Sequence, residues 1–216
     1  MDNNKLKSFF DFACELEKLK KLERFKGQHY WKDYPELPRY ESVADHTWRV
    51  AMLVLIMADQ LSKKINLEKA LMMVLIHDLP EIITGDMSPL GDDGTGKNTY
   101  AFDKEKADER QLEEKDAAAS LFDILPAAEA KKLFDLWLEY DRQQSFEAQA
   151  VKALDKIEAL MQVLQYRDGH FFKKHLAFNI SYALKWLEID PAIAALGNFV
   201  VAEMKKRYKE FKKGVN

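Results

Sequence analysis

Apolar residues recur at steps of three and four along most of the chain, which is the spacing of one face of an α-helix. The first such stripe is formed by Leu6, Phe9, Phe10, Ala13, Leu16, Leu19 and Leu22. A later stripe is formed by Val151, Leu154, Ile157, Met161 and Leu164. Strict alternation of apolar and polar residues, which would indicate a half-buried strand, is scarce. The pattern therefore predicts an all-α fold of about eight helices.

Capping residues and helix breakers divide this pattern into separate helices. A connector from Gly27 to Tyr40 contains two prolines and is expected to be irregular. Ser42 and Asp45 form an S-x-x-D capping pattern, which predicts a second helix over residues 43–63. Asn66 can cap a third helix. Later helices are expected from about Phe102 to Phe122, from Pro126, from Ser145 to Tyr166, from about Phe171 to Glu188 and from Pro191 to Lys213.

The length of 216 residues fits one domain with a sizeable core. We expect a single-domain helical bundle over residues 1–216. Its core should be built from the second helix, the third helix and the helix that starts at Ser145. The central part would span about residues 40–166, and the C-terminal helices over residues 170–213 would pack on it.

Composition narrows the range of functions. The formal net charge of −3 argues against long DNA or RNA as a partner, because nucleic-acid-binding domains usually carry a basic face. Cys14 is the only cysteine, which excludes an internal disulfide and a cysteine-rich zinc site. The longest uncharged apolar run, residues 50–58, is too short to cross a bilayer, and the polar start leads into no secretory segment. We therefore expect a cytoplasmic protein without a membrane partner.

The stretch from Leu75 to Asp86 contains four side chains that could bind a metal ion or transfer protons. They are His77, Asp78, Glu81 and Asp86. On a helix, Glu81 would lie one turn beyond the His-Asp pair. The six residues before His77 carry no charge, so this helix is expected to be buried nearly all round. Buried carboxylates need partners, and a divalent cation would stabilise two of them at once. The alternative is a core histidine with acids that face solvent.

Two more residues extend this cluster, His46 at the start of the second helix and Asp155 in a helix with an apolar face. The order H … HD … D resembles the HD-domain metal-dependent phosphohydrolases. The likeness is strongest to their 5′-deoxynucleotidase branch and covers roughly residues 15–170. The segments that carry it are residues 39–48, 76–81, 85–86, 137–140, 147–148 and 154–156.

The resemblance implies a metal centre in an HD-domain bundle. His46, His77, Asp78 and Asp155 would bind one divalent ion. Two imidazoles and two carboxylates suit Mn²⁺, Co²⁺, Fe²⁺ or Zn²⁺. Glu81 would be the general acid or base beside the ion, and its alternative is an acid on the helix surface.

Three further residues have candidate roles, and two of them also have a non-catalytic explanation. Asp86 matches the family's second catalytic carboxylate, although aspartate is also common in turns. Arg39 could bind a substrate phosphate through its guanidinium fork, or lie solvated on the surface. Trp31 could form an aromatic wall for a sugar or base. Here the sequence departs from the family, because Tyr30 stands where an arginine usually precedes the tryptophan, which leaves selectivity for deoxyribose open.

These features predict a metal-dependent phosphomonoester hydrolase that acts on (deoxy)nucleoside 5′-monophosphates, and the resemblance suggests a homodimer. Two alternatives stay open. One is a hydrolase of another phosphorylated small molecule, and the other is a non-catalytic metal-binding regulatory protein. Glu81 and Asp86 favour catalysis, because a site that only binds would not need them.

The loop over residues 86–97 contains a false motif. Residues 91–97 satisfy the G-x-x-x-x-G-K pattern of a P-loop. That motif needs a buried strand before it and Ser or Thr after the lysine, whereas Asn98 follows here and Asp92 and Asp93 would repel a phosphate. We therefore expect a surface loop that serves as a lid beside the site.

Overall fold

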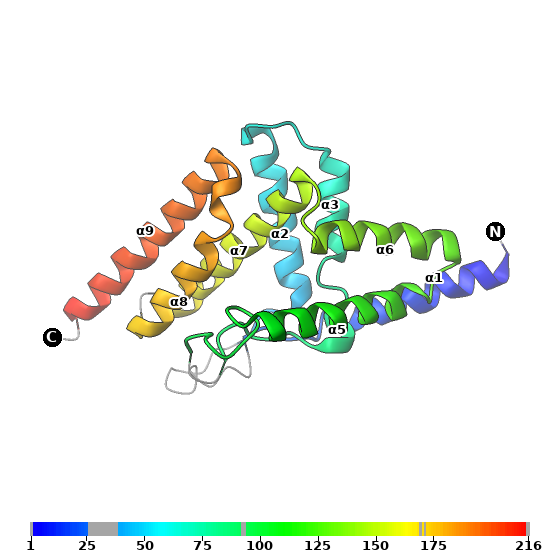
Figure 1. Ribbon diagram of the computed structural model, residues 1–216, viewed down its shortest axis with the longest axis horizontal. Coiled ribbons are helices and arrows are strands. Elements are labelled where there is room, and N and C mark those ends of the chain that lie inside the picture. The colour runs from blue at the N-terminus through cyan, green and yellow to red at the C-terminus, as the bar shows by residue number, and fades with distance from the viewer. Residues whose placement is uncertain (1, 26–38, 92–93, 169, 171, 215–216) are drawn as a thin grey trace.

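The computed structural model describes residues 2–25, 39–91, 94–168, 170 and 172–214. Within these ranges the regular elements are all helical, apart from one isolated β-bridge between Glu23 and Ser42. The α-helices in chain order are α1 (Asn3–Glu15), α2 (Val43–Met57), α3 (Leu67–Ile76), α4 (Glu81–Thr84), α5 (Lys104–Phe122), α6 (Ala127–Asp141), α7 (Phe146–Arg167), α8 (Lys173–Leu184) and α9 (Pro191–Gly214) (Figure 1). All except α4 have ten residues or more. The prediction of an all-α fold is confirmed.

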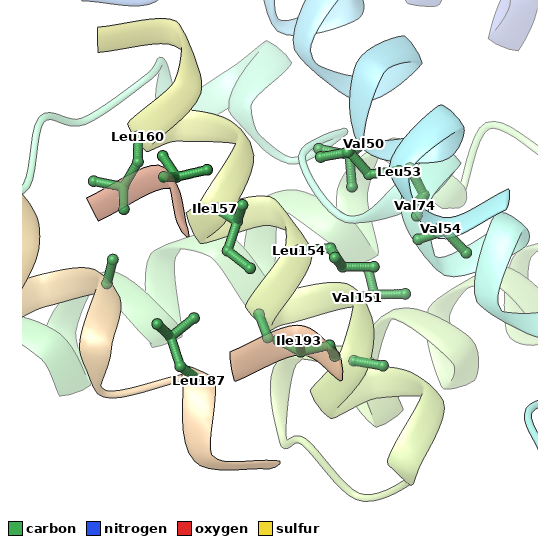
Figure 2. Packing of buried hydrophobic residues seen from close by; sticks show 14 of the residues in the cluster. Val50, Leu53, Val54, Val74, Val151, Leu154, Ile157, Leu160, Leu187 and Ile193 are labelled. Atoms are coloured by element: carbon green, nitrogen blue, oxygen red, sulfur yellow. The ribbon is translucent and has the colours of Figure 1, made fainter. Parts of the chain in front are cut away.

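The helix α7 lies at the centre of the packing. It contacts α2 and α3 on one side and α8 and α9 on the other (Figure 1). Its buried residues Val151, Leu154, Ile157 and Leu160 pack between apolar side chains of α2 and α3 and those of the C-terminal helices (Figure 2). The expected core of the second helix, the third helix and the Ser145 helix is thus confirmed. Among the helices that the structure describes, none is both long and apolar enough to span a bilayer.

The capping residues act as the sequence predicts, but two helices end early. Ser42 and Asp45 form both hydrogen bonds of a capping box at the start of α2. The helix α2 ends at Met57 and gives way to a 3₁₀ turn, so the expected end at residue 63 is wrong. Beyond the 3₁₀ turn the backbone at Leu61 is extended, and the Ser62 N–H donates to Asp190 at 2.8 Å instead of continuing the helical pattern. The first helix likewise ends in a 3₁₀ turn after residue 15.

The third helix ends before the His-Asp pair, which corrects the expected single helix. The helix α3 ends at Ile76, and the chain turns between His77 and Pro80. Pro80 has no N–H to donate and disfavours helical backbone before it, so α4 begins as a separate helix. Trp137 Nε1 donates to the carbonyl oxygen of His77 at 3.1 Å and holds this turn. The helix is not buried all round, because Leu75 is 59% exposed.

The described part of the 86–97 loop packs onto the protein. The Thr99 hydroxyl donates to the carbonyl of Pro89 at 2.6 Å, and the Tyr100 hydroxyl donates to the carbonyl of Met87 at 2.8 Å. Among the described residues, no strand precedes this loop, and the next helix starts only at Lys104. The rejection of a P-loop therefore holds for the part of the loop that can be described. The lid stays a prediction.

Candidate metal centre

Three parts of the fold bring four potential metal ligands to one point. His46 lies in the first turns of α2, Asp155 lies in α7, and His77 and Asp78 lie in the turn after α3. His46 Nε2 is 3.2 Å from Asp155 Oδ1 and 3.6 Å from Asp78 Oδ2, and His77 Nε2 is 3.1 Å from Asp78 Oδ2. His46, His77 and Asp155 each have a possible ligand atom within 4.8 Å of those of the other two. The structure thus brings together all four residues that the sequence selects.

The spacing of these atoms fits a metal ion. Ligands about 2.1 Å from an octahedral ion are about 3.0 Å apart along each edge of the octahedron, close to the measured separations. The Nε2 atoms of His46 and His77 are buried and have no hydrogen-bond partner. A buried polar atom without a partner is costly, and a coordinated cation would satisfy both nitrogens. The donor set of two imidazoles and two carboxylates therefore fits a divalent transition metal.

The second nitrogen of His46 is held by a residue that the sequence reading did not select. Nδ1 of His46 hydrogen-bonds with the carboxylate of Glu158, which is fully buried. Burial and Arg24 lower the pKa of His46, but Glu158 and Asp155 raise it more, to about 9. An arriving metal ion would therefore displace a proton from His46 at neutral pH. Glu158 fixes the ring so that Nε2 faces the other ligands.

His77 is oriented by the backbone and by two aromatic residues. Its Nδ1 lies 2.7 Å from the carbonyl oxygen of Val74, which sets the tautomer with Nε2 free for a metal. Tyr140 packs edge-on against the ring at 5.4 Å between centroids, and Trp137 holds the backbone carbonyl of His77. Both histidines therefore have one nitrogen occupied by the protein and the other directed to the ligand cluster.

A second group of acids lies behind His46, but it already has positive partners. Glu41 and Glu158 approach His46 closely enough that the three could hold an ion. However, Arg49 Nε donates to Glu158 at 2.6 Å, and Arg49 Nη2 and Arg24 Nη1 lie 3.6 and 3.7 Å from Glu41. These two guanidinium groups supply the positive charge there. The Nε2 side of His46 differs, because Nε2 of His46 and Nε2 of His77 are buried there without a hydrogen-bond partner.

Arg24 reaches this centre through backbone pairing. Its N–H donates to the carbonyl of Glu41 at 2.9 Å, and the N–H of Val43 donates to the carbonyl of Leu22 at 2.9 Å. Burial lowers the pKa of Arg24, but Asp86 and two glutamates raise it more, so the guanidinium stays charged. Its Nη1 is buried and makes no hydrogen bond. Nη1 lies 3.7 Å from Glu41 and 3.9 Å from Glu158, so Arg24 is an ion-paired cation close to the metal ligands whose Nη1 has no hydrogen-bond partner.

Glu81 is buried beside the ligand cluster. Its carboxyl is 7% exposed, and its Oε2 has no hydrogen-bond partner. Burial raises the pKa of Glu81 well above its usual value, and the charges of Asp78 and Asp86 raise it further. Arg110 lies 4.0 Å away and opposes this shift. Glu81 lies near the ligands, as the sequence predicts. A turn between α3 and α4, and not one continuous helix, places it there.

A cavity of about 390 Å³ opens onto the cluster. His77, Asp78 and Asp155 line it together with Glu81 and Asp86. The basic residues in its wall are Arg24, Arg110, Lys152, Lys156 and Lys185. This size and this mixture of metal ligands and cations suit a small anionic molecule.

Three other candidates from the sequence have different outcomes. Asp86 lines the cavity, and its carboxylate accepts a hydrogen bond from the N–H of Phe25 at 3.4 Å. Arg39 is exposed, pairs with Asp45 and does not line the cavity. Its guanidinium is therefore occupied on the surface, as in the solvated alternative. Trp31 lies outside the described residues.

Arg24 and Glu158 lie at the candidate site but were not selected from the sequence. Glu158 follows Asp155 by three residues in a helix, a spacing that places both carboxylates on one face and could have identified it. Arg24 carries no comparable signal, because its position depends on pairing with a segment 17 residues further along.

Comparison with known proteins agrees with this geometry. Residues 16–196 match the family described as HD domain. The human protein named 5′-deoxynucleotidase HDDC2 is 32% identical over 135 residues, which are 62% of this chain and 59% of the human protein. The Dictyostelium discoideum protein of the same name is 30% identical over 166 residues, 74% of this chain and 78% of that protein. This chain thus spans less than two thirds of the length of the human relative.

A solved structure shares the fold. It is described as a predicted metal-dependent phosphohydrolase from Magnetospirillum magnetotacticum MS-1 and is 22% identical to this chain. The two superpose with a TM-score of 0.66 over 96% of this chain and 97% of the other. At this identity the likeness supports the helical architecture alone.

Replacing Glu158 with glutamine should weaken metal binding. Glu158→Gln keeps the shape of the side chain but removes the negative charge that orients His46. Loss of such a supporting acceptor typically lowers metal affinity about 10–100-fold. Calorimetric titration of the stripped protein with Mn²⁺ or Co²⁺ measures this change, and the exposed Glu188→Gln is the matched control. Unchanged affinity in Glu158→Gln would show that His46 needs no anionic partner.

Proposed function

This chain belongs to the HD domain family, and on that premise we propose that it is a metal-dependent phosphomonoester hydrolase acting on deoxynucleoside 5′-monophosphates. The observation that carries the proposal is the meeting of His46, His77, Asp78 and Asp155 at the separations of an octahedral edge. These residues lie beside Glu81, whose carboxyl oxygen has no partner. The names of the curated relatives suggest the substrate class, and the cavity volume of about 390 Å³ is in the usual range of small-molecule sites.

One divalent ion, of Mn²⁺, Co²⁺, Fe²⁺ or Zn²⁺, would be held by the two Nε2 atoms and by oxygens of Asp78 and Asp155. Once bound, such an ion polarises a phosphoryl group and lowers the pKa of water. Glu158 and the Val74 carbonyl keep the two imidazoles in the orientation that this binding requires.

Arg24 would bind the phosphate of the substrate. It lines the cavity, stays charged and has a buried Nη1 without a hydrogen bond. A guanidinium matches a phosphate in both charge and geometry. Arg39 was the sequence candidate for this role, but its exposed pairing with Asp45 supports Arg24 instead.

Glu81 would move the proton. Its Oε2 has no hydrogen-bond partner and could accept a proton from the attacking water, and burial raises the pKa of Glu81 well above its usual value, which makes the carboxylate a stronger base. Asp86 would act by keeping Arg24 and Phe25 in place, because it contacts the Phe25 N–H and contributes to the charge balance of Arg24. A buried Glu81 beside the metal ligands favours a catalytic protein over a regulatory protein that only binds metal.

The homodimer, the single-domain organisation and the cytoplasmic location stay predictions, as does the contact of Trp31 with a sugar or base.

The direct test is a phosphate-release screen with stripped protein. Each of Mn²⁺, Co²⁺, Fe²⁺ and Zn²⁺ is added back separately, and phosphate release is measured from deoxyribonucleoside and ribonucleoside 5′-monophosphates. We expect no release without metal and faster release from deoxyribonucleotides. Release of phosphate from other small phosphomonoesters only would support the alternative hydrolase. Full metal binding without turnover of any phosphomonoester would support the regulatory alternative.

Replacing Glu81 with glutamine should lower the rate of hydrolysis without affecting metal binding. Glu81→Gln should retain metal and fold, but kcat should fall by about 10²–10⁴, the usual contribution of a general base. The wild-type kcat should fall as the pH drops through the raised pKa of Glu81, because protonation removes the base. This acidic limb should be missing in Glu81→Gln, whereas the exposed Glu113→Gln keeps it. A variant with more than about a third of wild-type kcat would exclude Glu81 as the base.

Two matched lysine substitutions identify the arginine that binds phosphate. Arg24→Lys keeps the charge but loses the planar fork, so KM should rise about tenfold or more. Arg39→Lys should leave KM within twofold, because Arg39 lies outside the cavity. Steady-state kinetics on one deoxynucleotide, with metal content measured in parallel, give the comparison. If Arg39→Lys raises KM and Arg24→Lys does not, then Arg39 binds the phosphate, as the sequence predicted.

A further inference from the structure

Tyr140 has a buried hydroxyl that no group in the described structure satisfies. It lies near the end of α6, is 3% exposed and lines the same cavity as His77, Asp78 and Asp155. Its Oη makes no hydrogen bond. Buried hydroxyls are normally hydrogen-bonded, so a hydroxyl in a cavity that has no protein partner is available to a molecule bound there.

A neighbour on the same helix provides the contrast. Trp137 is also buried in α6 and lines the cavity, but its Nε1 donates to the backbone of His77 at 3.1 Å. The protein therefore uses the polar atom of Trp137 for structure and leaves that of Tyr140 free.

The ring of Tyr140 packs against one of the metal ligands. The ring stands edge-on to His77 at 5.4 Å, and Lys152 Nζ lies 5.1 Å from the ring centroid. The two charges that act most strongly on the phenol are those of Asp155 and Asp78. Neither carboxylate accepts a hydrogen bond from the phenol. The phenol thus lines the same cavity as three of the metal ligands, but its hydroxyl makes no hydrogen bond with them.

We propose that Tyr140 is a catalytic residue whose hydroxyl donates a hydrogen bond to a non-bridging oxygen of the substrate phosphoryl group. This inference rests on the proposed hydrolysis of a phosphomonoester. A phenol is a neutral donor, so it binds an anionic oxygen without repelling a nearby cation. In phosphoryl transfer, negative charge spreads over the equatorial oxygens, where each positioned donor stabilises it. Arg24 approaches from another segment of the chain, so the two donors act on the same group independently.

The substitution Tyr140→Phe removes only the hydroxyl and keeps the ring on His77. Two titrations by calorimetry test the proposal, one of stripped protein with Mn²⁺ and one of Mn²⁺-loaded protein with inorganic phosphate. We expect metal affinity within twofold of wild type and a Kd for phosphate raised about tenfold, since a hydrogen bond to a charged group contributes on this scale. The kcat on a deoxynucleotide should fall by at least as large a factor.

Tyr208→Phe serves as the matched control, because Tyr208 packs in α9 and does not line the cavity. It should bind metal and phosphate as the wild type does. An unchanged Kd for phosphate in Tyr140→Phe would overturn the proposal. A loss of metal affinity with unchanged phosphate binding would also overturn it, because the hydroxyl would then serve the ligands.

The wild-type protein shows whether the proposed function fails or only the proposed role of Tyr140. A wild-type protein that neither binds phosphate nor hydrolyses any phosphomonoester would remove both proposals. A wild-type protein that does both, matched by an equally competent Tyr140→Phe, would overturn the role of Tyr140 alone.

Discussion

The rest of the structure depends on the burial of His46 between two carboxylates. Its Nδ1 contacts Glu158 and its Nε2 lies 3.2 Å from Asp155, and all three residues are buried. Charged groups removed from water destabilise a fold unless each has partners of opposite charge and satisfied hydrogen bonds. Glu158 obtains these from Arg49 as well as from His46. Removal of any one member would therefore leave a buried charge without its partner, which costs more than the loss of a surface ion pair.

The helix α7 connects this polar centre to the apolar core. Asp155 and Glu158 are one turn apart and share a face, so one helix supplies both a metal ligand and the acceptor that orients another ligand. Other residues of the same helix, Val151, Leu154 and Ile157, are buried against α2, α3 and the C-terminal helices (Figure 2). The positions of Asp155 and His46 are thus fixed by close packing, because α2 and α7 contact each other directly. Rigid packing keeps ligand atoms within a fraction of an ångström of their working positions.

The sequence was sufficient for the parts of the site that local patterns determine. His77 and Asp78 were selected because a histidine and an acid in an apolar stretch need partners, whereas the full ligand set with His46 and Asp155 was implied by the resemblance to the HD-domain phosphohydrolases. Helix starts were predictable because Ser42 and Asn66 are capping residues with defined hydrogen bonds. The break at Pro80 was missed because periodicity continued through it. The position of Arg24 was missed for a different reason, since it depends on non-local backbone pairing that no spacing in the sequence records.

The two sides of His46 differ in one respect that explains where a metal ion would bind. On the Nδ1 side, Arg24 and Arg49 supply positive charge to Glu41 and Glu158. On the Nε2 side, Lys156 pairs with Oδ2 of Asp155 at 3.0 Å, while Oδ1 faces His46. Lys156 pairs with the other oxygen of Asp155, so the oxygens of Asp155 and Asp78 that face the imidazoles are the ones placed to bind an ion. Asp78 is also 21% exposed and lines the cavity, which gives an ion a route from solvent to this position. Charge balance and access thus select the same side of His46, and the cavity that admits the ion is the one whose basic wall suits a phosphate.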